Sequence, residues 1–198
     1  MITISLFLFS SAVILLQLFA LLAGTKGLPL LSTLYWFDFP QFLGGAKFSL
    51  FSSSSLANYK LEVVAISALL IASIVAIAAL CVVVGCFQKQ RLLFSVKKGI
   101  KLLRGVLALW IFAVISNVAS ILFLVFGLLS HLSKYPNVLS IQAGMSSNMM
   151  WYEGLGMASY FVFGSTALLL LQSFFIFGLW KKFQKWKMFN SRLASLSI

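Results

Sequence analysis

Four stretches of the chain are apolar almost without interruption, and the connecting segments and the tail hold all of the charges. The stretches cover residues 2–24, 63–87, 105–130 and 154–180, and none contains Asp, Glu, Lys or Arg. Each is long enough to cross a hydrocarbon core of about 30 Å, which takes about 20 helical residues. The pattern predicts an all-α integral membrane protein with a four-transmembrane-helix bundle, in which residues 1–198 form a single domain.

Composition agrees with lipid as the surrounding solvent. Of 198 residues, 62% are hydrophobic and 9% are charged, whereas a soluble domain carries about a quarter of its residues as charges. The first stretch is also open to interpretation as a secretory signal peptide. It lacks a basic start and is long for a signal core, so we expect it to be retained as a helix.

Basic residues are unevenly distributed between the connecting segments. Segment 88–104 holds six of them and the tail 181–198 holds five, with no acid in either, while all three acids fall in segments 25–62 and 131–153. Positively charged loops stay on the cytoplasmic side of a membrane. We therefore expect both termini and the loop 88–104 in the cytoplasm, with 25–62 and 131–153 as outer loops.

The first outer loop contains a candidate hairpin. Residues 33–39 and 46–52 are rich in β-forming side chains, and Pro40 and the pair Gly44-Gly45 lie between them. Two short strands joined by such a turn are favoured, which predicts a small extracellular β-hairpin. Neither outer loop contains a cysteine, so no disulfide braces them.

The eleven basic residues of segments 88–104 and 181–198 form a collar beside the helix ends. A net charge of +12 raises nucleic acid as a partner, but the tail lysines alternate with aromatic residues, as is typical of a membrane interface. We predict contact with anionic lipid and no nucleic acid; the alternative is that the charges only set topology during insertion. The predicted lipid-contact residues are Lys97, Lys98, Lys101, Arg104, Lys181, Lys182, Lys185 and Lys187.

Two parts of this collar have helical spacing. Lys97, Lys101 and Arg104 share one face of residues 94–104, which predicts a helix lying in the headgroup plane before the third span. In the tail, Trp180, Phe183 and Trp186 are spaced by three, which predicts an interfacial anchor. Nearby Cys86 is either acylated or an inert thiol.

Inside the membrane, small and amide side chains indicate helix packing. Ala68, Ala72 and Ala76 repeat every four residues and predict close approach within the bundle, with an external docking face as the alternative. Asn117 and Gln172 are predicted to form interhelical hydrogen bonds. They would instead line a solute path if they faced one another or a continuous wet cavity, although no ionisable residue accompanies them.

Residues suited to catalysis are scarce. The chain has one histidine, three acids and two cysteines, and they form no carboxylate pair, metal-ligand spacing or phosphate-binding loop. We therefore predict no enzymatic activity, no cofactor and no metal. His131 is expected to be a surface or interfacial residue.

The order of segments resembles a known group of membrane proteins. The first span ends in AGTKG at residues 23–27, and the larger first outer loop contains LYWFDF at 34–39, before three further spans and a basic tail. This arrangement is similar to the fungal PalI-type tetraspans, which include eisosome proteins, within the broader claudin-like set. The resemblance implies a plasma-membrane tetraspan that organises membrane domains, senses ambient signals or serves as an accessory subunit.

These observations predict a non-catalytic scaffold, membrane-domain organiser or accessory subunit whose function is contact. Its partner would be a larger membrane protein or a second copy of the chain. Trp36, Phe37 and Asp38 are the expected contact residues at the outer surface. The alternative is a small transporter or channel component with a polar path near Asn117 and Gln172.

Overall fold

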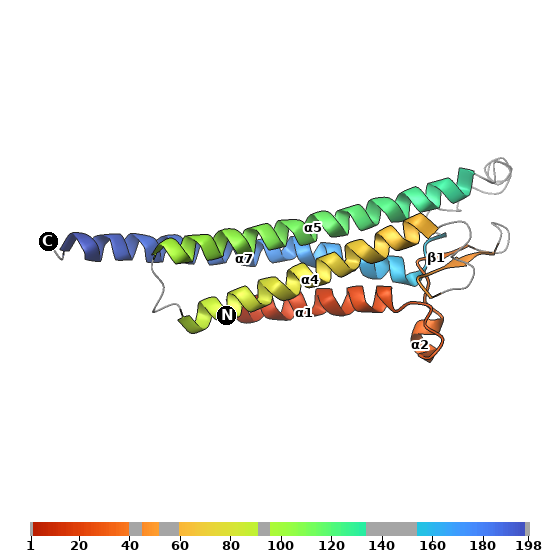
Figure 1. Cartoon of the computed structure of the whole chain (residues 1–198), viewed down its shortest axis with the longest axis horizontal. Coiled ribbons are helices and arrows are strands. Elements are labelled where there is room, and N and C mark those ends of the chain that lie inside the picture. Colours follow the sequence, from red (N-terminus) through yellow and green to blue (C-terminus); the bar gives the residue numbers. More distant parts are fainter. Residues whose placement is uncertain (1, 40–44, 52–59, 91–95, 134–153, 197–198) are drawn as a thin grey trace.

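The computed structural model describes residues 2–39, 45–51, 60–90, 96–133 and 154–196. Its main elements are four long helices that lie side by side in an elongated bundle (Figure 1). They are α1 (Ile2–Leu21), α4 (Lys60–Gln90), α5 (Val96–Ser133) and α7 (Met157–Leu196). Successive long helices run in opposite directions, so the bundle has an up-down-up-down topology (Figure 1).

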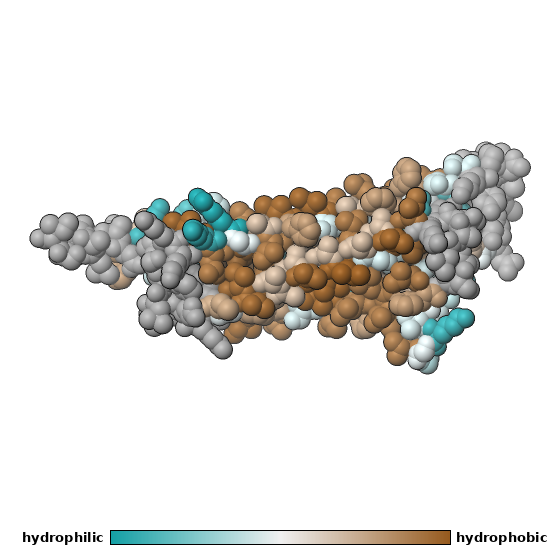
Figure 2. Space-filling model, viewed as in Figure 1, coloured by the Kyte–Doolittle hydropathy of each residue, from teal (hydrophilic) through white to brown (hydrophobic). Residues whose placement is uncertain are grey.

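All four long helices are long and apolar enough to cross a membrane. Figure 2 shows hydrophobic residues covering the middle of the bundle, with hydrophilic residues gathered towards its two ends. A band of apolar surface between polar ends matches the hydrocarbon core between two headgroup layers. The prediction of a four-helix integral membrane fold is therefore confirmed, and the chain has the architecture of a multi-pass membrane protein.

Helix α5 corrects one local prediction. Residues 96–104 do not form a separate helix in the headgroup plane, because α5 runs unbroken from Val96 to Ser133. No proline interrupts it, and Gly99 and Val106 are both buried, so the start of α5 stays along the bundle. Helix α7 likewise continues beyond Trp180 to Leu196, and its last part projects past the other helices (Figure 1).

A tight turn connects α1 to the short helix α2 (Pro29–Ser32). Gly24 follows the end of α1 with a φ of 81°, a left-handed conformation that favours glycine after a helix. Its N–H donates to Leu31 O at 2.7 Å, which holds α2 against the end of α1. Pro29 occupies the first turn of α2, where its missing N–H costs nothing.

The predicted hairpin is present. Strands β1 (Phe37–Asp38) and β2 (Lys47–Phe48) pair antiparallel, with Phe37 opposite Phe48 and Asp38 opposite Lys47. The other edge of β1 makes an antiparallel bridge from Phe37 to Leu155, just before α7. Backbone groups on both sides of this segment are therefore paired. We call this end of the bundle the hairpin end and the opposite end, where α5 begins and α7 ends, the basic end (Figure 1).

The interior is stacked in layers along the bundle axis. One apolar cluster at the hairpin end joins the aromatic residues of the hairpin to all four long helices. A second lies in the middle, around Val13, Ile77 and Leu169. A third lies towards the basic end, around Leu6 and Ile176. Polar side chains occupy the two levels between these clusters.

Candidate functional site

Asn117 lies at the centre of a polar node to which every long helix contributes. Its Oδ1 accepts hydrogen bonds from Gln17 Nε2 at 3.1 Å and from Ser165 Oγ at 2.9 Å, with Thr166 Oγ1 at 3.5 Å. Its Nδ2 donates to Ser73 Oγ and, at 3.0 Å, to the carbonyl oxygen of Ala113. All five side chains that form the node are buried. The node therefore ties the four helices together at one level.

Gln172 takes part in a different contact. Its Nε2 donates to Ser10 Oγ at 2.9 Å, linking α7 to α1, and both residues are fully buried. Ser10 and Gln17 are seven residues apart on α1, which corresponds to about 10 Å along the helix. The middle apolar cluster, with Val13 and Leu169, occupies that interval. The two amide side chains thus sit in separate layers with an apolar layer between them.

Each layer leaves one strong acceptor without a partner. Gln17 Oε1 and Gln172 Oε1 are buried and unbonded within the described residues. The amide orientation of Gln17 is set by its neighbours: Asn117 Nδ2 donates to Ala113 O, so its Oδ1 must receive Gln17 Nε2. The geometry provides helix-to-helix hydrogen bonds and no ionisable group, so these layers lack a side chain that relays a proton.

The alanine stripe on α4 faces the interior at one end only. Ala76 is buried, Ala72 is half-buried and Ala68 is exposed. Four residues advance an α-helix by about 400°, so a four-residue repeat drifts by about 40° at each step. The interior face follows alternating three- and four-residue steps through Leu70 and Ser73 instead. The prediction that Ala68 packs within the bundle was therefore wrong.

Trp36 is a core residue at the hairpin end. Its side chain has no exposed surface, and its Nε1 donates to Ala20 O at 2.9 Å. Ala20 is in the last turn of α1, where carbonyl groups lack a regular helical partner, so the indole caps the helix. The Trp36 carbonyl accepts from Gly156 N at 2.8 Å and from the Ser159 hydroxyl. Trp36 therefore joins α1 to the start of α7.

Phe37 is equally enclosed, with 1% of its surface exposed. Its ring lies against Phe39 and Phe48, and Phe39 stacks on His131 with ring centroids 3.8 Å apart. His131 is buried, so of its two expected places, surface or interfacial, the surface was wrong. Phe37 and Phe39 lie two positions apart on the strand and turn to the same inner face, while Trp36 is buried against the end of α1. Trp36 and Phe37 are thus not available to an outside partner, and predicting them as contact residues was wrong.

Asp38 lies on the open side of the hairpin. Its carboxylate is 3.6 Å from Lys47 Nζ, directly across the strand pair, and both side chains are about half exposed. Lys47 Nζ also lies 5.2 Å from the centre of the Tyr35 ring. Of the three predicted contact residues, Asp38 alone has an accessible side chain.

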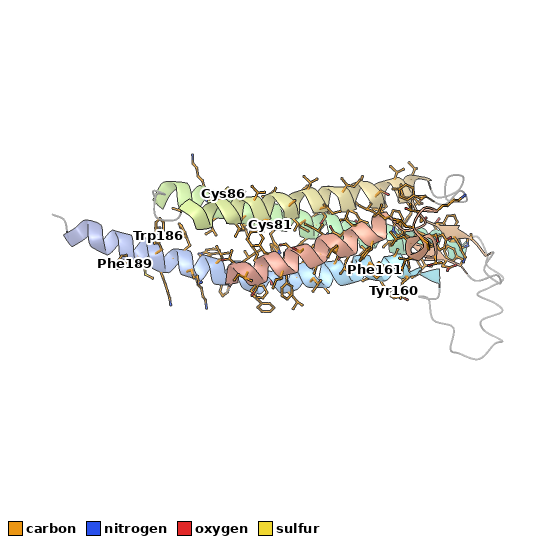
Figure 3. All side chains as sticks on the ribbon, turned by 90° about the horizontal axis from the view of Figure 1, so that it is seen from below. Cys81, Cys86, Tyr160, Phe161, Trp186 and Phe189 are labelled. Carbon is orange, nitrogen blue, oxygen red and sulfur yellow. The ribbon has the colours of Figure 1, made fainter. Side chains whose placement is uncertain are left out.

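The basic residues gather at the opposite end. Exposed side chains there are those of Lys101, Arg104, Lys181, Lys182, Lys185 and Lys187. Lys97 and Lys98 belong to α5, but their side chains lie outside the described part of the chain. Figure 3 shows Trp186 and Phe189 on α7 at this end, which also carries Cys86, while Tyr160 and Phe161 lie near the other end. Trp186 is half-buried beside Phe183, whereas Phe189 is exposed.

Within the described ranges, no group of three or more His, Cys, Asp or Glu side chains could hold a metal ion.

Sequence reasoning identified Asn117 but not its partner Ser73, nor Ser10 as the partner of Gln172. The position of Ser10 one heptad before Gln17, on the same face of its helix, was a sequence signal, whereas the three-four spacing through Ser73 is visible only from burial. Comparison of the chain with protein-family models, curated proteins and solved structures found no match.

Proposed function

We propose that this chain is a non-catalytic tetraspan that works through contact, as a scaffold or membrane-domain organiser or as an accessory subunit of a larger membrane protein. The observation that carries the proposal is the layered interior. Asn117 and Gln172 do not face one another, and each bonds to other helices on its own level. Polar groups used in this way lock helices together and leave the outside of the bundle as its working surface.

The layered interior weighs against the transporter alternative. A path through the bundle would have to pass the middle cluster, where Val13, Ile77 and Leu169 are almost completely buried. Transport sites near the middle of a membrane commonly use broken helices. All four long helices here are continuous through the middle of the bundle.

The proposed placement has the basic end in the cytoplasm, on the positive-inside rule. There the exposed lysines and Arg104 would meet the anionic leaflet, which attracts each such charge by about 1 kcal/mol. A plasma-membrane location rests on the resemblance to PalI-type tetraspans. The hairpin end, with its two paired strands, would face outward.

With Trp36 and Phe37 in the core, the proposed protein-contact surface moves to α2. Leu30 is 79% exposed and Leu28 is also exposed, although both are large apolar residues beside the end of α1. Figure 1 shows α2 standing away from the four long helices. Exposed apolar side chains on such a projection are suited to a partner's surface.

Site-specific photo-cross-linking in native membranes tests this surface. A photoreactive residue at Leu30 should give a discrete protein adduct, identified by mass spectrometry. The matched control is Val75, which is 62% exposed in the middle of α4 and faces lipid. If Leu30 and Val75 gave only lipid adducts, contact through α2 would be refuted.

Flux into proteoliposomes tests the competing function. Purified protein should not accelerate entry of ions or small polar solutes over empty vesicles. Asn117→Leu and Ser173→Ala serve as paired variants, because among the described residues Ser173 bonds only to Leu170 O of its own helix. A flux that Asn117→Leu abolished and Ser173→Ala preserved, in folded protein, would favour a transporter over a scaffold.

A further inference from the structure

A groove of about 390 Å³ lies between α5 and α7 at the basic end. Volumes of about 300–1,000 Å³ are typical of sites for small molecules. Its innermost lining residues, Ile176 and Phe183, are buried, and Leu103 and Leu107 beside them are half-buried. The Phe183 ring packs directly against the backbone of Gly99, because a Cβ added there would lie only 2.7 Å from the ring. The inner part of the groove is therefore apolar and well packed.

The outer part of the groove is polar and positively charged. Arg104, Trp180, Gln184 and Lys187 line it, and all four are exposed. Along α7, Ile176 and Lys187 are eleven residues apart, about 16 Å. The groove thus runs from Ile176 in the apolar cluster, past Arg104 and Trp180, to the ammonium group of Lys187.

The two cations have no acidic partner that the chain itself provides nearby. No Asp or Glu occurs between Glu62 and Glu153 or after Glu153. A second copy in the same orientation would present Asp38 at its hairpin end, on the opposite side of the membrane. An anion that complements Arg104 and Lys187 would therefore come from elsewhere, and one that also fills the apolar inner part would carry a hydrocarbon chain.

We propose that this groove is a specific binding site for one anionic phospholipid. An acyl chain lies along Leu107 and Ile176, and the phosphate accepts hydrogen bonds from Arg104, Lys187 and Gln184. Arginine is suited to this role because its planar donors match phosphate oxygens. Trp180 lies at the headgroup level, where indole rings concentrate. The site deepens the lipid contact of the proposed function, but it needs no protein partner.

Native mass spectrometry of the purified full chain in detergent tests the site, with dioleoylphosphatidylglycerol and dioleoylphosphatidylcholine as titrated probes. The wild type should bind one molecule of phosphatidylglycerol saturably, and phosphatidylcholine should not displace it. The double variant Arg104→Gln/Lys187→Gln should bind it about 30-fold more weakly, which is about 2 kcal/mol at 1.4 kcal/mol per tenfold, or about 1 kcal/mol for each charge.

A matched double variant removes the same charges outside the groove. Lys101→Gln/Lys185→Gln takes one cation from α5 and one from α7, both exposed and neither lining the groove. This variant should bind phosphatidylglycerol with an affinity within about threefold of the wild type. Equal losses in the two double variants would overturn the proposal and leave a diffuse basic surface.

The apolar half of the site is tested with all charges kept. Leu107→Trp should fill the inner groove and abolish the saturable lipid, while Ala108→Trp, at the exposed neighbouring position, should not. Excess inorganic phosphate should fail to displace the lipid, because it lacks the chain. Circular dichroism confirms that each variant is folded. The site would be refuted if Leu107→Trp retained the lipid or if phosphate displaced it. It would also be refuted if the wild type bound no lipid saturably. These outcomes leave cross-linking at Leu30 unaffected.

Discussion

The two ends of the bundle use the same residue types in opposite ways. At the hairpin end Trp36 and Phe39 are almost fully buried, whereas at the basic end Trp180 and Phe189 are exposed. The first pair belongs to a connecting segment and the second to a long helix. Aromatic identity and helix-or-loop position therefore do not decide which rings are inside.

Backbone pairing makes the difference. The segment around β1 is hydrogen-bonded to β2 on one edge and to residues 155–158 on the other, so the hairpin is closed against the helices. The projecting end of α7 satisfies its own backbone within the helix, and Lys187 and Phe189 there are exposed. At the hairpin end the paired backbone therefore goes with buried rings such as Phe39, and on the unpaired end of α7 Phe189 is exposed.

Replacing one tryptophan at each end should give the largest difference in the free energy of unfolding between the two ends. Trp36→Ala removes a buried indole and its bond to Ala20 O, and should lower the free energy of unfolding by about 3–5 kcal/mol. Trp180→Ala removes an indole that is 44% exposed and should lower it by less than about 1 kcal/mol. Reversible unfolding in mixed micelles measures both; similar losses would mean that the hairpin end is not the more tightly built one.

Glycine substitutions test the close approach at the hairpin end. A Cβ on Gly156 would lie 1.9 Å from the carbonyl oxygen of Tyr35, which is backbone and cannot swing away. Gly156→Ala should therefore destabilise the fold by about 3 kcal/mol, the upper end for overpacking. Gly105→Ala meets no atom within 4 Å and should stabilise α5 by about 0.5–1 kcal/mol. The midpoint temperature of unfolding in detergent should fall for Gly156→Ala and rise for Gly105→Ala. An unchanged midpoint for Gly156→Ala would contradict the observed strand contact.

The smallest expected effect concerns the helix interior between the two ends. Ala76→Leu inserts volume at a buried position and should cost about 1–3 kcal/mol, whereas Ala68→Leu at an exposed position should change stability by less than about 0.5 kcal/mol. The same unfolding assay separates them. If Ala68→Leu proved the more damaging, the four-residue stripe would be the true packing face.

Much of the candidate site followed from the sequence, but its partners did not. Asn117 was predicted to bond between helices because an amide within a membrane needs a partner. Which residues it meets depends on the rotation of four helices, and Gln17 lies 100 positions from it in the chain. The hairpin was predicted from β-forming residues around Pro40 and Gly44, but its second paired edge at Leu155 is more than a hundred residues away.

The sequence by itself determined the four spans and the separation of basic from acidic segments, because length, apolarity and charge are local properties that lipid reads directly. It also placed the hairpin, since turn-forming residues act over a few positions. Only the tertiary structure decided that Trp36 is core, that Ala68 faces outward and that α5 and α7 enclose a groove lined by Arg104 and Lys187. Burial depends on which neighbours arrive from distant parts of the chain, and that arrangement is set by packing and backbone pairing together.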